Sequence, residues 1–291
     1  MSNGKTIVLT GASGLLGRYL TQLLAPDHKV HALVRKMPTD PVPGVGYHEV
    51  DLGGNWTPAG LPQTGVDSVI HLAQSAHFRE VPEKALDVFN VNVASTAKLL
   101  DYAWRAGAGQ FVHASSGGVY GAGSDAFHEN SPITPTGNLG YYLGSKLCGE
   151  VLTQSYASQM QVAVLRFFFI YGAGQNRSML IPRLVDSVRD GKPVTLAGRD
   201  GLRINPVHVS DAAAAVMAVL ESKESATYNV AGDETITLRE LCLKIEAVVG
   251  RKAQFVESAG TAMDIIADIS AMKRRLHKPV VRLDAGLKDL L

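Results

Sequence analysis

Short apolar segments alternate with amphipathic segments along the first 172 residues, and this alternation constrains the fold more than any other feature. The apolar segments are residues 5–10, 28–35, 46–52, 66–74, 109–116 and 161–172. Strands that are apolar along their whole length and alternate with helices are typical of a parallel sheet covered on both faces. We therefore expect an α/β fold with a doubly wound parallel sheet.

The alternation of apolar and amphipathic segments becomes less regular after Gly172. Helical patterns then cover residues 179–191, 210–222 and 237–250, and short strand patterns cover residues 193–198, 205–210 and 227–232. Thr237 and Glu240 have the spacing of a capping box at the start of the last of these helices. We expect a larger domain over residues 1–172, to which residues 205–232 return, and a smaller lobe over residues 173–291.

The segment TGASGLLG places Gly11, Gly14 and Gly17 between the first strand and the first helix. Free N–H groups and the helix dipole at such a helix start favour a pyrophosphate, and glycines let the backbone turn tightly and approach it. The spacing also suits an ordinary strand-to-helix turn. Its place directly after the first strand favours a dinucleotide.

The end of the second strand indicates which dinucleotide is bound. An acid at this place would hold the ribose hydroxyls, but the sequence has Val34, Arg35 and Lys36. Arg35 suits a 2′-phosphate and favours NADP over NAD, unless it is a solvated surface arginine. Asp51, after the third strand, is a candidate to bind the adenine amino group.

Two adjacent tyrosines precede a lysine in the segment GNLGYYLGSK. On a helix, Tyr142 and Lys146 share a face because they are four residues apart, whereas Tyr141 is five residues from the lysine. A phenol has a pKa of about 10, and a nearby ammonium lowers it towards neutral pH. Tyr142 is therefore a candidate acid/base, and Ser115 and Ser116, at the end of the fifth strand, offer a hydroxyl to the same substrate oxygen.

Composition argues against several classes of function. The 291 residues carry a formal net charge of +1, so no field of the whole molecule attracts nucleic acid or a membrane. Two cysteines are too few for a disulfide framework, and we find no signal peptide and no apolar run that could span a bilayer. None of the nine histidines has the spacing of a metal site, and His71 and His113 are expected to be hydrogen-bonded core residues. We expect a cytoplasmic protein without a metal.

The motifs, taken in order, resemble the extended short-chain dehydrogenase/reductase family, in its NAD-dependent epimerase/dehydratase group acting on nucleotide sugars. They are TGASGLLG, HLAQ, VNVAST, SSGGVYG, YYLGSK, LRFFFIYGAGQ, LRINPVHVSDAA, YNVAG and ADISAMKRRLH. The resemblance implies a Rossmann-type domain with a smaller substrate lobe, an NAD or NADP cofactor, and a homodimer.

The resemblance also implies roles for individual residues. Ser116, Tyr142 and Lys146 would be the catalytic triad, with Tyr141 as a packing residue. The cofactor would contact Gly11, Ser13, Gly14, Leu15, Leu16, Gly17, Arg35, Asp51, Leu52, Leu72, Ala73, Gln74, Asn92, Tyr142, Lys146 and Phe167. The substrate would contact Ser116, Phe168, Phe169 and Arg203.

Two departures from the family pattern narrow the reaction. Dehydratases of the family have an Asp-Glu pair directly after the catalytic serine or threonine, and this chain has Gly117-Gly118. This argues against dehydration and leaves chemistry at one carbinol carbon. We expect a C4 epimerase of a nucleotide sugar, with an NADPH-dependent 4-ketoreductase as the alternative.

The second departure is Phe169, where many relatives have an asparagine that contacts the substrate diphosphate. Arg203 matches the family's phosphate-contacting arginine, and a guanidinium suits a diphosphate unless it forms a surface salt bridge. The three consecutive phenylalanines also leave open a carbonyl reductase that acts on a substrate without a nucleotide.

Overall fold

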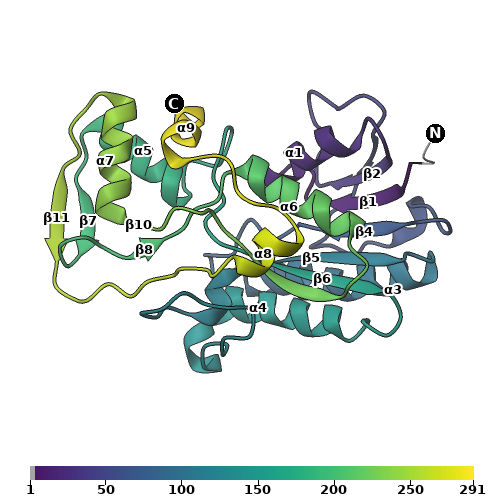
Figure 1. Ribbon diagram of the computed structural model, residues 1–291. Helices are drawn as coiled ribbons and strands as arrows, with labels where there is room; N and C mark the ends of the chain where they lie inside the picture. The colour runs from purple at the N-terminus through teal and green to yellow at the C-terminus, as the bar shows by residue number, and fades with distance from the viewer. Residues whose placement is uncertain (1–3) are drawn as a thin grey trace. The chain divides into compact units, whose positions relative to one another are not determined.

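The computed structural model of the protein describes residues 4–291 (Figure 1). The chain divides into two compact units. The first contains the residues up to Val119 together with Thr134–Arg166 and Val216–Tyr228. The second contains Tyr120–Ile133, Phe167–Ala215 and Asn229–Leu291. Of the residues 205–232 that were expected to return to the larger domain, Val216–Tyr228 belong to the first unit.

A seven-stranded sheet forms the framework, in the order β3-β2-β1-β4-β5-β6-β9. Its strands are β1 (Thr6–Thr10), β2 (Lys29–Val34), β3 (Gly46–Glu49), β4 (Ser68–His71), β5 (Gln110–Ser116), β6 (Gln161–Phe167) and β9 (Ala226–Val230). The neighbours β1 and β2, β1 and β4, β2 and β3, and β4 and β5 pair in parallel. The expected doubly wound, Rossmann-type sheet is confirmed, and its order reverses between β1 and β4.

Helices cover both faces of the sheet because each has one apolar side. Helix α1 (Leu15–Leu24) buries Leu16, Leu20 and Leu24, which recur every four residues. It lies on the opposite face from α3 (Ser95–Arg105) and α4 (Thr136–Gln154), as Figure 1 shows. The core beneath the latter two helices includes Val69, Leu99, Leu100 and Phe111, all at 0 % exposure.

The helical segment expected between residues 85 and 106 is interrupted. It consists of α2 (Ala85–Phe89), a π-helical turn η2 (Asn90–Ala94) and α3. The wide turn buries Asn92, whose carbonyl accepts a hydrogen bond from Thr96 Oγ1 at 2.7 Å. Helix α4 is also irregular, because Gly140 has φ 65° and ψ 174°, so the regular helix starts at the tyrosine pair.

The second unit has its own core between α5 (Leu180–Asp190) and α7 (Leu238–Val249). The capping box of Thr237 and Glu240 is confirmed at the start of α7. Two small sheets join β7 (Val194–Ala197) to β11 (Phe255–Ser258), and β8 (Arg203–Ile204) to β10 (Ile236–Thr237).

The strand expected at residues 205–210 was wrong. Only an isolated bridge between His208 and Tyr171 forms there, and α6 (Val209–Glu221) begins immediately after it. The remaining elements are η1 (Pro58–Gly60), η3 (Gly117–Tyr120), α8 (Ser270–Arg275), α9 (Leu283–Gly286) and η4 (Leu287–Leu290).

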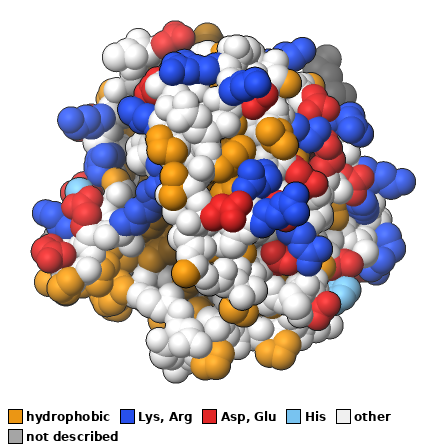
Figure 2. All heavy atoms as spheres, turned by 90° about the vertical axis from the view of Figure 1, so that its left-hand side faces the viewer, with side chains coloured by type: hydrophobic (Ala, Val, Ile, Leu, Met, Phe, Trp, Pro, Cys, Tyr) orange, Lys and Arg blue, Asp and Glu red, His pale blue; other side chains and the backbone are white. Residues whose placement is uncertain are grey.

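The surface carries charges of both signs. On the face shown in Figure 2, Lys and Arg side chains are interspersed with Asp and Glu side chains, in keeping with the net charge of +1. Within residues 4–291, none of the helices is both long enough and apolar enough to cross a bilayer.

Candidate active site

A cleft of about 230 Å³ lies at the carboxyl ends of β1 to β4, where the strand order reverses. Ligands of open parallel sheets bind at such a reversal. Among the predicted cofactor contacts, those that line the cleft are Gly11, Ser13, Gly14, Arg35, Asp51, Leu52, Leu72, Ala73 and Gln74. The structure therefore brings together residues that are up to 63 positions apart, within the first unit alone.

The glycine loop leaves no room for side chains at two of its positions. Gly11 has φ +72°, and a Cβ there would lie 2.8 Å from the amide nitrogen of Ala73. A Cβ on Gly17 would lie 2.1 Å from the carbonyl oxygen of Gly11. Among the described residues no side chain caps the start of α1 at Gly14, and Gly14 itself lines the cleft. This cradle fits a diphosphate.

The end of β2 carries an exposed guanidinium on the cleft. Arg35 lines it directly after Val34, the last residue of the strand. Across the cleft, Asp51 Oδ1 accepts a hydrogen bond from the Gly53 amide at 3.0 Å. The lining of the cleft thus contains one cation, Arg35, and two carboxylates, Asp51 and Asp87.

Tyr142 is connected to this cleft by a hydrogen bond. Its phenol donates to Gln74 Oε1 at 2.9 Å, and its ring packs against Phe78 with centroids 5.0 Å apart. Tyr141 is 41 % exposed, so its expected packing role is wrong. Of the two tyrosines, only Tyr142 contacts a residue that lines the cleft, and it is the one that the i, i+4 spacing from Lys146 favours.

The expected low pKa of Tyr142 is not found. Burial raises the pKa of the phenol to about 12, and the positive charge of Arg79 opposes this rise. Lys146 is only 3 % exposed, and its ammonium donates to the Ala114 carbonyl at 2.9 Å. Burial also lowers the pKa of Lys146 to about 8, opposed by the charge of Glu150. The protein alone therefore holds the phenol protonated.

The two serines at the end of β5 have different partners. Ser115 is buried, and its hydroxyl donates to the carboxylate of Glu150. Ser116 is half-buried, and its Oγ accepts a hydrogen bond from the Gly118 amide at 3.2 Å. Since the Ser115 hydroxyl already donates its hydrogen bond to a carboxylate, Ser116 is the better placed of the two to donate to a ligand.

Asn92, a predicted cofactor contact, is 2 % exposed and does not line the cleft. Its Oδ1 accepts from the Ser75 amide and its Nδ2 donates to Ser145 Oγ, both at 2.9 Å. Ser145 Oγ in turn donates to the Tyr142 carbonyl at 2.6 Å. Asn92 thus braces the loop after β4 against the turn of α4 that carries the tyrosine.

Six other predicted cofactor residues also lie outside the lining of this cleft, namely Leu15, Leu16, Gly17, Tyr142, Lys146 and Phe167. Sequence reasoning missed the lining residues Leu33, Val34, Val50, Ser75, Ala76, Asp87 and Val91. Several of them are next in sequence to predicted contacts at strand ends, and this adjacency could have identified them. Asp87 and Val91 carried no such signal, because the interrupted helix brings them to the cleft.

The buried histidines differ from each other. His71 is hydrogen-bonded as expected, with Nδ1 2.7 Å from Thr10 Oγ1 and Nε2 3.0 Å from Thr96 Oγ1. The ring of His113 is also buried, and its polar neighbour is the backbone of Lys146, without a hydrogen bond of good geometry among residues 4–291. The described part of the chain contains no group of three His, Cys, Asp or Glu side chains able to hold a metal.

The predicted substrate residues of the second unit are engaged with protein groups. Phe168 is 1 % exposed, which leaves its ring no surface for a ligand in this conformation. Phe169 has φ 44°, unusual for a residue with a bulky side chain, and packs against the core of its unit. The Arg203 guanidinium pairs with Asp264, with Nη2 2.6 Å and Nε 2.7 Å from Oδ2.

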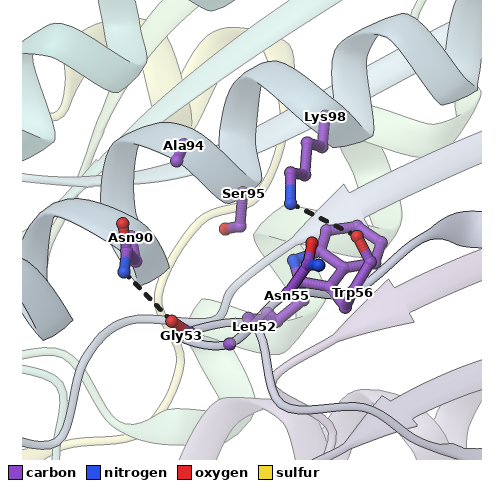
Figure 3. A pocket seen from close by; sticks show the side chains of 9 residues that line it. Leu52, Gly53, Asn55, Trp56, Asn90, Ala94, Ser95 and Lys98 are labelled. Carbon is purple, nitrogen blue, oxygen red and sulfur yellow. Dashed lines mark hydrogen bonds between the residues drawn. The ribbon is translucent and has the colours of Figure 1, made fainter.

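A second hollow, of about 310 Å³, lies between the loop that follows β3 and the helical segment that carries Asn90 and Lys98 (Figure 3). Leu52 lines both this hollow and the cleft. Lys98 reaches across from α3, and its Nζ donates to the Trp56 carbonyl at 3.2 Å, while Asn90 Nδ2 donates to the Gly53 carbonyl at 3.1 Å. These two hydrogen bonds hold the loop that carries Asp51 and Leu52.

Comparisons with known proteins agree with this geometry. The model of the NAD dependent epimerase/dehydratase family matches residues 7–231. The chain is 28% identical to an uncharacterized UDP-glucose epimerase of Bacillus subtilis, covering 97% of this chain and 96% of the relative. It is 29% identical to a dTDP-glucose 4,6-dehydratase of Streptomyces griseus, covering 97% and 91%. The solved structure of MoeE5 in complex with UDP-glucose and NAD has a TM-score of 0.83 at 26% identity, covering 98% and 97%.

Proposed function

The chain belongs to the NAD dependent epimerase/dehydratase family and is an enzyme of the extended short-chain dehydrogenase type, and from this premise we propose that it is a nucleotide-sugar 4-epimerase. The observation that carries the proposal is the position of Tyr142. Its phenol is hydrogen-bonded to Gln74 of the dinucleotide cleft, and Lys146 follows one helical turn later.

The proposed roles of the residues follow from their positions. A nicotinamide dinucleotide, when bound, supplies the acceptor and donor for the hydride of C4. Tyr142 takes the proton from the C4 hydroxyl and gives it back to the C4 oxygen after the keto sugar has turned over. Ser116 hydrogen-bonds the same oxygen, and Lys146 favours the phenolate by its positive charge. The pKa of Tyr142 is about 12 in the protein alone, with Lys146 already in place, so the phenol also needs the positive ring of an oxidised nicotinamide before it can act as a base.

The cofactor preference is proposed from Arg35. The guanidinium lines the cleft at the end of β2, where an acid would have favoured the ribose hydroxyls of NAD. We therefore propose NADP as the preferred dinucleotide. If this preference is strong, the alternative reaction gains support, because a 4-ketoreductase uses NADPH once and releases it, whereas an epimerase recycles its cofactor.

Dehydration is disfavoured by the residues that follow Ser116. A Cβ on Gly118 would lie 2.9 Å from Leu143 Cδ2, so an acidic side chain at that position would displace the leucine. This stretch therefore has no general acid to expel water. Reaction at C4 alone remains, although relatives of this chain include dehydratases.

For the substrate, we propose that Arg203 holds the diphosphate of the nucleotide. Its guanidinium is half-exposed and oriented by Asp264. A bidentate guanidinium suits a diphosphate better than an ammonium does. The positive φ of Phe169 and the burial of Phe168 do not favour the alternative in which these rings line a pocket for a ketone without a nucleotide.

We also propose a homodimer. Exposed apolar side chains occur on all three helices that follow β4 and β5, namely Leu86 and Phe89 on α2, Trp104 on α3, and Tyr141 and Val151 on α4. A second copy of the chain would cover them. Light scattering should give twice the monomer mass of 31.0 kDa, and Trp104→Glu should reduce it.

The experiment that tests the function is incubation of the pure protein with a panel of nucleotide sugars and their 4-keto forms, with NAD(H) and NADP(H) each supplied. Formation of the C4 epimer without net change in nicotinamide absorbance supports the epimerase. Stoichiometric loss of NADPH absorbance with a 4-keto sugar supports the ketoreductase. Reduction of simple ketones alone would overturn both.

A further inference from the structure

A buried carboxylate that no proposed step uses lies one helical turn beyond Lys146. The Glu150 side chain is only 2% exposed, and it forms a two-pronged ion pair with the buried Arg166 of β6. Arg166 Nη2 is 2.7 Å from Oε2, and Arg166 Nε is 3.0 Å from Oε1. A buried ion pair seldom adds net stability over apolar packing, so its presence here points to a role other than stability.

The end of β5 is attached to α4 at successive residues. The Ala114 carbonyl accepts from Lys146 Nζ, and the Ser115 hydroxyl donates to Glu150. The next residue is Ser116, whose hydroxyl the proposed reaction uses. Glu150 therefore contacts the strand at the residue that precedes the candidate catalytic serine.

Glu150 also faces Lys146 as an i, i+4 neighbour on the helix. We propose that Glu150 is a positioning residue that keeps the buried Lys146 ammonium charged and fixes the strand end that presents Ser116. One carboxylate thus serves two buried cations, Lys146 and Arg166. This inference rests on the proposed function only in the role it gives to Lys146 and Ser116.

The other groups around Lys146 do not supply a negative charge. His71 on β4 and His113 on β5 are both buried, and burial lowers the pKa of His71 to about 3 and that of His113 well below its ordinary value. Tyr142, one turn earlier on α4, is protonated because burial raises its pKa. Glu150 is the anion that opposes the effect of burial on the pKa of Lys146.

Glu150→Gln tests this role by a direct titration of Lys146. Protein labelled with ¹³C at lysine Cε is followed by NMR against pH, and the resonance missing from Lys146→Met identifies Lys146. In the parent we expect the titration midpoint of the Lys146 ammonium to lie near pH 8. In Glu150→Gln the midpoint should fall by about 1–3 pH units, because the Arg166 cation remains while the anion is gone. The alkaline limb of kcat should move to lower pH with little change in the substrate KM.

Two further variants separate charge from position. Glu150→Asp keeps the charge but shortens the reach, so the Lys146 midpoint should return most of the way towards the parent value. Ser115→Ala keeps the ion pair, so the midpoint should move much less than in Glu150→Gln. If Glu150→Gln does not give a cooperative melt, Glu150→Gln with Arg166→Gln removes both charges, and a smaller fall in the same direction is expected.

An unchanged Lys146 midpoint in a folded Glu150→Gln protein would overturn the proposal. A lowered midpoint in a protein that turns over none of the nucleotide sugars would leave the electrostatic role of Glu150 standing and remove the proposed function. If the parent is active but the Lys146 titration midpoint is unchanged in Glu150→Gln, the proposed function stands and the role of Glu150 is removed.

Discussion

In the first unit the glycine loop presents backbone N–H groups and a close strand-to-helix turn, whereas in the second unit the Arg203 guanidinium already pairs with Asp264. The first arrangement is made by backbone, and a Cβ on Gly11 or Gly17 would destroy it. The second is made by side chains that have an alternative partner within the protein. The glycine loop is thus formed by the backbone itself, while the proposed substrate contact depends on a guanidinium that Asp264 orients.

Tyr142→Phe gives the largest effect expected in the first unit. The ring and its contact with Phe78 remain, and only the acid/base oxygen is lost. General acid/base catalysis contributes about 10²–10⁴-fold, so kcat should fall by that order. Cofactor affinity, measured by fluorescence titration, should change only a few-fold. The matched control is Tyr141→Phe, which removes the exposed neighbouring hydroxyl and should be mild. An inactive Tyr141→Phe enzyme would contradict the choice of Tyr142 as the acid/base from its spacing to Lys146.

Arg203→Ala tests the second unit. Hydrogen bonds to charged groups contribute roughly 1.5–3 kcal/mol, so the Michaelis constant of the nucleotide sugar should rise about ten- to a hundred-fold. Inhibition by the free nucleoside diphosphate should disappear, and cofactor binding should be spared. Asp264→Asn keeps the arginine and should retain diphosphate binding. Equal binding of nucleoside diphosphates by the parent and Arg203→Ala would remove the contact from the proposal.

Arg35→Ala should have a smaller effect because the side chain is exposed to solvent. Exposed charge pairs contribute about 0.2–1 kcal/mol, so binding of NADP(H) should weaken by up to about fivefold more than binding of NAD(H). Calorimetric titration with both dinucleotides measures the difference. Equal weakening of the two would leave no reason to prefer NADP.

Lys146→Met should have the smallest effect, and it concerns stability. Burial lowers the pKa of Lys146 to about 8 in the folded protein, so the unfolded chain binds more protons between pH 8 and its ordinary value of 10.5. The cost of burying the ammonium is therefore fully present below pH 8 and falls as pH rises. Lys146→Met should raise Tm by a few degrees at pH 7 and by less near pH 10. A difference in Tm that grows with pH would contradict this sign.

The sequence by itself determined the parallel sheet and the glycine loop, because both depend on residues that are close together in the sequence. Apolar strands predict a sheet covered on both faces, and i, i+4 spacing predicts a shared helix face. The resemblance to the family selected most of the lining residues at the ends of β1 and β4, whereas only Arg35 was selected at the end of β2.

Only the tertiary structure decided which polar groups are already engaged. The π turn buries Asn92, which is hydrogen-bonded to the loop after β4, and Glu150 accepts the hydrogen bond from the Ser115 hydroxyl. Burial raises the pKa of Tyr142 and lowers that of Lys146, which disfavours the charged form of each. The strand expected at residues 205–210 was overridden by the start of α6. Desolvation and hydrogen-bond partners depend on what long-range packing places around a group, and no local pattern encodes that.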